Sequence, residues 1–517
     1  MNNLEEVPTT DNKLLMVKNI LTSFDNDNVK YCHWKSNEHA LAAVCGDTDL
    51  DILFDCDQYE VVRATLKKSG FVKFKTAWFL RYPYIEDYLG IDSIQGKIVH
   101  VHAHFKLIVG EARVKSFHLA WESEILRKRY LLQKSKIYAS PVVEELLLLI
   151  IRSMLKLPIM QLGNYENKLE SKDANREFDW LKKQVAEKEL IELTKVYLGE
   201  KSVNCISNIY RDGINYSSLL ALKKMTKEKI DEFRRYSKPK AIFLRCFRWF
   251  FARLAAVNKR LPLFNVSNHR AMPNGGLVVA VLGADGSGKS TQVKKVKSVL
   301  IKKMDTVYVY MGSGDGSSSW HRKIINLFIF IYKKLHVERN KNKNISLECL
   351  VAKNNKLKVT IPKLILGLSL ALEKKFKLKE IEKAKKRGAI VITDRYPNDQ
   401  FVGFNDGPIV PTIDKKFNPL RGLVAEYIHN CYRYATVVSP DLVIKLIGDP
   451  DSLHERRSGE MSKESIVFKQ DGIKKLSFGK NTKVIEVNAC LPKHDITKAI
   501  LSEIGGLFVE ESRSKNN

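Results

Sequence analysis

The stretch that most constrains the fold runs from residue 277 to residue 291. An apolar run at 277–282 is followed by Gly283-Ala284-Asp285-Gly286-Ser287-Gly288-Lys289-Ser290-Thr291, and a lysine-rich segment with helical spacing comes next. Glycines at these positions let the backbone turn tightly, so that successive N–H groups can point at one anion. A helix that begins there adds the positive end of its dipole. The spacing G-x-x-x-x-G-K-S therefore predicts a strand, a phosphate-binding loop and a helix.

This loop predicts a nucleotide site with ATP and Mg²⁺ as cofactors. Lys289 is expected to reach the β- and γ-phosphates, and the Ser290 hydroxyl is expected to bind Mg²⁺. The candidate nucleotide-binding residues are Gly283, Asp285, Gly286, Ser287, Gly288, Lys289, Ser290 and Thr291.

Three further apolar segments, 306–310, 389–394 and 442–447, are typical of buried strands. The second of them ends in Asp394-Arg395. We predict that Asp394 orients Mg²⁺ or receives the proton of the acceptor, and that Arg395 clamps a phosphate through two hydrogen bonds.

A lid is predicted in the segment 449–460, which lies between the strands expected at 442–447 and 484–488. Its arginines, Arg456 and Arg457, would neutralise the charge of a transferring phosphoryl group once water is excluded. Together with Lys289, Asp394 and Arg395, they complete the set of candidate catalytic residues.

These motifs together resemble the thymidylate kinase family, a branch of the nucleoside monophosphate kinases. The resemblance covers about residues 276–507 and rests on the loop 283–291, on T-D-R-Y at 393–396 and on D-P-D…E-R-R-S-G-E at 449–460. It implies an α/β fold with a parallel sheet and an ATP- and Mg²⁺-dependent phosphotransferase, a thymidylate-like kinase. The loop 312–316 and the stretch 397–408 differ from the family's acceptor-site segments, so the acceptor stays open.

The N-terminal part carries a second candidate metal site. Asp49 and Asp51 alternate with apolar residues in a predicted strand, so both side chains lie on one face. Two such carboxylates can hold one or two Mg²⁺ ions on a nucleoside triphosphate. With Ser36-Asn37 upstream, this pattern resembles the nucleotidyltransferase superfamily. The resemblance implies an α+β nucleotidyltransferase-like domain.

A later strand, 98–104, presents His100, His102 and His104 on one face, where that superfamily has a third carboxylate. Three interpretations stay open. The row is a metal site assisted by histidine, or part of a domain that binds nucleotide without turning it over, or a half-exposed face with ordinary hydrogen bonds.

The chain is expected to contain five parts. They are a nucleotidyltransferase-like domain at 1–135, a helical annex at 136–236, a basic and aromatic linker at 237–276, a thymidylate kinase-like domain at 277–507 and a disordered tail at 508–517. The layout as a whole resembles fusions of these two kinds of domain.

The net charge of +29 makes polyanionic partners plausible besides nucleotide substrates, although no specific nucleic-acid motif is present. Arginines and aromatic residues alternate in 243–254, a pattern that fits either an anionic membrane surface or the docking of two domains.

Eight scattered cysteines, a polar N-terminus and no apolar run of about 20 residues favour a cytoplasmic protein. Two alternatives to the kinase remain. One is a nucleotidyltransferase that acts through Asp49 and Asp51, with the C-terminal half as supplier or sensor of nucleotide. The other is an ATP-gated protein that binds a membrane or a polyanion.

Overall fold

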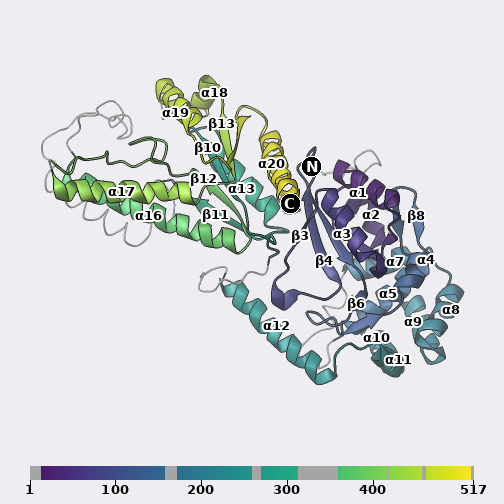
Figure 1. Cartoon of the computed structure of the whole chain (residues 1–517). Coiled ribbons are helices and arrows are strands. Elements are labelled where there is room, and N and C mark those ends of the chain that lie inside the picture. The colour runs from purple at the N-terminus through teal and green to yellow at the C-terminus, as the bar shows by residue number, and fades with distance from the viewer. Residues whose placement is uncertain are drawn as a thin grey trace. The chain divides into compact units, whose positions relative to one another are not determined.

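The structure is a computed structural model that describes residues 13–157, 172–258, 269–312, 359–416, 418–456 and 462–513. The chain divides into two compact units (Figure 1). Unit 1 comprises Met1–Arg270 and Gly505–Asn517, and unit 2 comprises Ala271–Ile504. The boundary after Arg270 lies six residues before the predicted end of the linker at 276.

Unit 2 is built on a five-stranded sheet in which every pair of neighbouring strands is parallel. In spatial order the strands are β11 (Thr306–Tyr310), β12 (Ile390–Asp394), β10 (Val278–Gly283), β13 (Leu442–Ile447) and β14 (Lys483–Asn488). The three central strands are buried almost throughout, because helices cover both faces of a parallel sheet. This confirms the predicted α/β class and fits a P-loop kinase-like fold.

The helices of unit 2 occupy the connections that parallel strands require. They are α13 (Lys289–Leu300), α16 (Ile361–Lys386), α17 (Pro419–Val437), α18 (Pro450–Glu455) and α19 (Lys463–Lys475), and the first part of α20 (Lys493–Arg513) follows the last strand. Asp394 is the last residue of β12 and pairs with Val281 on one side and Tyr310 on the other. This register places its carboxylate at the carboxyl edge of the sheet, beside the end of β10.

Unit 1 contains a seven-stranded mixed sheet. In spatial order its strands are β3 (Val72–Phe74), β4 (Ile85–Ile91), β5 (Ile98–His104), β2 (Leu50–Phe54), β1 (Tyr31–His33), β9 (Ile137–Ala139) and β8 (Tyr130–Leu132). The pairs β2–β5 and β1–β9 are parallel, and the others are antiparallel. Helices α1 (Leu15–Asn26), α2 (Ala40–Val44) and α3 (Tyr59–Lys68) contribute to a core shared with this sheet.

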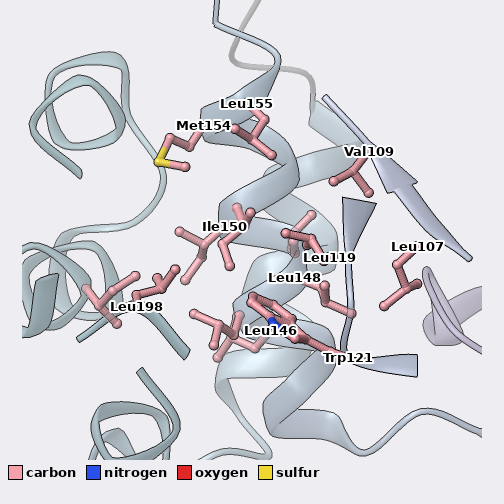
Figure 2. Packing of buried hydrophobic residues seen from close by; sticks show 14 of the residues in the cluster. Leu107, Val109, Leu119, Trp121, Leu146, Leu148, Ile150, Met154, Leu155 and Leu198 are labelled. Atoms are coloured by element: carbon pink, nitrogen blue, oxygen red, sulfur yellow. The ribbon is translucent and has the colours of Figure 1, made fainter. Parts of the chain in front are cut away.

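The helical annex packs around α5 (Val142–Leu155), which is buried on nearly every side, as its apolar sequence predicts. Figure 2 shows Leu146, Leu148 and Ile150 of this helix among residues from neighbouring elements. Those elements include the ribbon of β6 (Leu107–Val109) and β7 (Phe117–Leu119). The other helices of the annex are α7 (Lys172–Lys182), α8 (Glu187–Leu198), α9 (Val203–Asp212), α10 (Tyr216–Met225) and α11 (Lys227–Glu232), and α4 (Glu122–Arg127) precedes it.

The predicted basic and aromatic helix is α12 (Lys238–Asn258), and it docks on unit 1 itself. The ring of Phe251 lies 4.8 Å from the ring of Trp78. Arg248 donates one hydrogen bond to the carbonyl of Arg113 (2.7 Å) and another to that of Arg81 (3.1 Å). Phe243 and Phe250 contact the rings of Phe247 and Phe251 and are more than half exposed. The helix is therefore docked through Arg248 and Phe251, while neighbouring aromatic rings stay exposed.

The C-terminal helix α20 corrects the predicted tail at 508–517. Residues 508–513 continue this helix instead of being disordered, and residues 505–513 belong to unit 1. The reason is Phe508, which is fully buried and packs edge-on against Phe74 (5.8 Å between centroids). Burial of this aromatic ring stabilises the helical end by roughly 1.5–3 kcal/mol. Within the described ranges, no helix has the length and apolar character needed to cross a membrane.

Candidate functional site

The loop that joins β10 to α13 has a backbone that requires glycine. Gly286 and Gly288 have φ angles of +85° and +82°, a region that residues with a Cβ adopt at a cost. A Cβ on Gly283 would lie 2.4 Å from Ser287 Oγ and 2.9 Å from the carbonyl oxygen of Leu446 in β13. The predicted glycines therefore let this loop turn tightly against the sheet.

Lys289 is the first residue of α13, and its side chain is only 6% exposed. Its Nζ donates a hydrogen bond of 2.8 Å to the carbonyl of Ala284, within the loop. Burial, and then the neighbouring Arg395 guanidinium, lower the pKa of Lys289 to about 8. The ammonium group is thus held over the loop, where the sequence predicts the phosphates.

Ser290 and Asp394 form the predicted Mg²⁺ pair. The Ser290 hydroxyl donates a hydrogen bond to Oδ2 of Asp394 across the strand edge. The side chain of Asp394 is fully buried, and its Oδ1 has no hydrogen-bond partner among the described residues. A buried carboxylate oxygen without a donor is costly unless a cation or water binds it. A hydroxyl and a carboxylate are oxygen ligands of the kind Mg²⁺ prefers, so these residues fit this ion.

Asp285 holds two cations beside the loop. Arg395 Nη2 lies 3.1 Å from its Oδ1, and Lys469 Nζ lies 3.0 Å from its Oδ2. Burial alone would raise the pKa of the Asp285 carboxyl, but Lys289, Lys469 and Arg395 outweigh it and lower the pKa to about 2. Asp285 therefore stays ionised and fixes the positions of groups that can bind an anion.

Arg395 adopts a φ angle of +71°, in the left-handed region where a residue with a Cβ is strained. Its Nη1 lies 3.6 Å from Oδ2 of Asp406. Asp406 raises the pKa of Arg395 above its usual value in spite of burial, with Asp285 adding to the effect. Strained residues of this kind concentrate at functional sites.

Sequence reasoning missed three residues of this cluster. Lys374 on α16 is almost fully buried, and its Nζ lies 3.8 Å from Oδ1 of Asp406. Burial lowers the pKa of Lys374 to about 8. Lys469 and Asp406 complete the set. Both lysines belong to lysine-rich helical segments, and only the packing of the helices distinguishes them from their neighbours.

Of the two predicted lid arginines, the structure describes Arg456, which contacts a residue away from the loop. Arg456 follows α18 with an exposed side chain, and its Nη1 donates to the carbonyl of Ala489 (2.9 Å). Arg457 and the glycine-rich stretch 313–316 lie outside the described residues. Thr291, in the first turn of α13, is exposed. The role of Arg456 and Arg457 in a lid stays a prediction.

In unit 1 the predicted carboxylates meet the histidine row. Strand β2 pairs with β5 so that Asp51 lies opposite His102, and β4 places Asp87 on the other side of His102. Asp51 Oδ1 lies 2.8 Å from His102 Nδ1 and 2.8 Å from Lys35 Nζ. Asp49 Oδ2 lies 3.0 Å from His100 Nδ1.

His100 lies between two carboxylates, because its Nε2 is also 2.9 Å from Asp87 Oδ1. Burial lowers the pKa of His100, but the hydrogen bonds with Asp49 and Asp87 outweigh it, and the net direction is upward. Arg270 Nε lies 2.9 Å from the same oxygen of Asp87. Asp87 therefore already pairs with Arg270 and contacts His100, and Asp49 contacts His100.

The backbone N–H groups of the Ser36-Asn37 turn already have hydrogen-bond partners within the protein. The backbone N–H of Ser36 donates to Glu177 Oε1 (3.0 Å), and that of Asn37 donates to Glu145 Oε1 (2.9 Å). Both glutamates come from the helical annex, in which no candidate site residue was predicted. Burial raises the pKa of Glu145 to about 7. Carboxylates therefore fill positions at which a turn of this kind could bind a phosphate.

Comparison with known proteins gives distant relatives of part of the chain. No protein-family model matches it. An Escherichia coli (strain K12) protein, described as "Uncharacterized ATP-binding protein YghR", is 23% identical over 226 residues, which are 42% of this chain and 83% of that protein. A thymidylate kinase from Candida albicans superposes with a TM-score of 0.28 and 15% identity, over 46% of this chain and 93% of that structure.

Proposed function

We propose that the chain is an ATP- and Mg²⁺-dependent phosphotransferase whose reaction takes place at the loop between β10 and α13. The observation that carries this proposal is the meeting of Lys289, Ser290 and the buried Asp394 at one edge of the sheet. The ATP-binding description of the Escherichia coli relative supports the nucleotide.

The residues of the site would bind and orient rather than form covalent bonds. Lys289 pairs with phosphate oxygens as a point charge, and the loop N–H groups surround them. Asp394 and Ser290 would hold Mg²⁺, which supplies charge neutralisation between the phosphates when it is bound. Phosphoryl transfer needs little more than such positioning and electrostatic stabilisation.

We propose a nucleoside monophosphate, thymidylate-like, as the acceptor. Besides Lys289, the cluster contains Arg395, Lys374 and Lys469, which are held by Asp285 and Asp406. The phosphate of an acceptor could replace these carboxylates as the ion-pair partner of the same cations. A neutral alcohol carries no negative charge that could pair with these cations.

A panel of nucleoside and sugar monophosphates, incubated with ATP, Mg²⁺ and the full chain, tests the proposal. We expect one class to give a diphosphate and ADP in equal amounts, and Lys289→Ala to reduce the rate by roughly 10²–10³-fold or more. Lys295→Ala, on an exposed position of the same helix, is the matched control and should change little.

Two outcomes would contradict the proposal. One is turnover that survives Lys289→Ala. The other is pyrophosphate release that survives Lys289→Ala but is lost in Asp49→Ala, which would move the chemistry to unit 1 and favour a nucleotidyltransferase. A cytoplasmic location, where ATP is abundant, belongs to this proposal, and the free thiols of the described cysteines agree with it.

A further inference from the structure

Three side chains of unit 1 come together near the C-terminal end of β5. Asp51 Oδ1 and His102 Nδ1 are 2.8 Å apart, His102 Nδ1 and His104 Nε2 are 3.3 Å apart, and His104 Nε2 and Asp51 Oδ1 are 3.8 Å apart. The side chain of His104 is 1% exposed, and those of Asp51 and His102 are about one-fifth exposed. Nothing in the proposed kinase reaction uses this group.

Hydrogen bonds alone cannot satisfy all three contacts. His102 Nδ1 is a single nitrogen, so it either carries a proton or presents a lone pair. With a proton it can donate to Asp51, but it cannot accept from His104. With a lone pair it can accept from His104, but it then faces the carboxylate of Asp51 without a donor. One cation placed among the three atoms would accept a lone pair from each of them.

The spacing of the three atoms suits a small metal ion. The point in their plane that is equidistant from them lies about 2 Å from each atom, which matches the usual Zn–N and Zn–O distances. Ligand atoms of a tetrahedral zinc site lie roughly 3.3–3.6 Å apart, close to the mean of the three separations. The ring of Trp34 meets that of His104 edge-on at 5.0 Å and limits its rotation.

We propose that Asp51, His102 and His104 bind a divalent transition-metal ion, with Zn²⁺ as the best match. Two imidazole nitrogens and one carboxylate oxygen favour Zn²⁺ and its neighbours in the first row, whereas Mg²⁺ prefers sites made of oxygen alone. This site differs from the Mg²⁺ pair expected from sequence, because Asp49 pairs with His100 instead. Three protein ligands leave a fourth position open, as in zinc sites that bind water or a substrate.

Lys35 provides an independent check on this assignment. Its ammonium group lies 2.8 Å from the same Oδ1 of Asp51 and neutralises that carboxylate in the metal-free protein. A bound dication would repel this ammonium group. Removal of the charge by Lys35→Gln should therefore tighten metal binding, whereas loss of a ligand should weaken it.

The test is a titration of the tag-free full chain with Zn²⁺ in competition with a chromophoric chelator, with Co²⁺ absorption as a second readout. We expect one equivalent to bind in the presence of excess Mg²⁺, and His102→Gln and His104→Gln each to weaken it by more than about 100-fold. His118→Gln, at a histidine of the same unit that pairs with Glu122, is the matched control and should bind normally.

His102 is partly exposed, so His102→Gln serves if His104→Gln does not fold, and circular dichroism of the metal-free variants verifies folding. Unchanged affinity in both folded ligand variants would overturn the proposal. Displacement of Zn²⁺ by Mg²⁺ at similar concentrations would do so too, and so would an affinity that falls in Lys35→Gln. The visible band of tetrahedral Co²⁺ should be lost in the ligand variants and kept in His118→Gln.

Discussion

Arg395 combines a backbone conformation that glycine would adopt more easily with a side chain that only arginine provides. The left-handed conformation costs a residue with a Cβ on the order of 1–2 kcal/mol. Its guanidinium meets Asp285 and Asp406 at once. The ion pairs with Asp285 and Asp406 compensate for this strain, and the end of β12 places the side chain beside the loop.

The strain at Arg395 can be measured separately from its ion pairs. Arg395→Ala and Arg395→Gly both remove the guanidinium, but only the glycine variant also relieves the backbone. We expect the glycine variant to be more stable by about 1 kcal/mol in urea unfolding. At Lys295 in the middle of α13 the same two substitutions should show the opposite order, because glycine disfavours a helix. Equal stability of the two Arg395 variants would exclude strain.

The lowered pKa of Lys289 predicts how ATP binding depends on pH. In the empty protein the amine loses its charge as the pH rises through about 8. Bound phosphate favours the charged form, so binding above that pH must take up a proton. We expect the affinity for ATP·Mg²⁺ to fall between about pH 7 and pH 9, with proton uptake visible by calorimetry in buffers of different ionisation enthalpy. A flat profile would contradict a buried Lys289 with this pKa.

The lowered pKa of Lys289 also determines how this residue affects stability as the pH changes. The unfolded chain holds the proton of this lysine up to about pH 10.5, whereas the folded protein releases it near pH 8. Between these values the unfolded state binds more protons, so this lysine makes the free energy of unfolding rise with pH. Lys374 contributes in the same direction.

At the scale of elements, α12 is a docked helix that keeps large aromatic rings exposed. Phe251 packs on Trp78 and Phe79, whereas Phe243, Trp249 and Phe250 are about half exposed or more. The helix contains five basic residues and no acidic one. Exposed aromatic rings beside arginines fit the surface of an anionic bilayer, and we propose this partner for the exposed rings.

Vesicle flotation tests this proposal for α12. The full chain should float with vesicles that contain an anionic lipid, and Phe243→Ser combined with Phe250→Ser should weaken binding at least about tenfold, because two rings no longer enter the interface. Val196→Ser removes an apolar residue that is 75% exposed on α8 and should have no effect. Equal binding to neutral vesicles, or no loss in the double variant, would refute the proposal.

At the scale of the whole molecule, the two proposed sites lie in different units. A ligand stabilises the unit that binds it, by an amount set by its concentration relative to its Kd. We expect ATP·Mg²⁺ to raise the unfolding temperature of unit 2 and Zn²⁺ to raise that of unit 1. Differential scanning calorimetry with each ligand alone measures both, and Lys289→Ala and His102→Gln should each abolish one shift only. A shift of both transitions by either ligand would contradict independent sites.

The sequence was most informative where one residue type is required by covalent geometry. Glycines at 283, 286 and 288 and the strand before them located the loop, and Asp394 followed from the end of an apolar strand. Lys374, Asp406 and Lys469 could not be found, because their positions depend on how helices and loops pack against the sheet. The pairing of Asp49 with His100 likewise depends on strand register, which local patterns do not encode.

The division of unit 1 between both ends of the chain has a consequence for synthesis. A ribosome completes Met1–Arg270 first, then makes all of Ala271–Ile504, and only afterwards releases the turn of α20 that carries Phe508. At roughly 5–20 residues per second, the surface around Phe74 waits on the order of 10–50 s for its last partner. The first unit to emerge is thus the last to be finished, and during that interval its unfilled apolar site is open to chaperones.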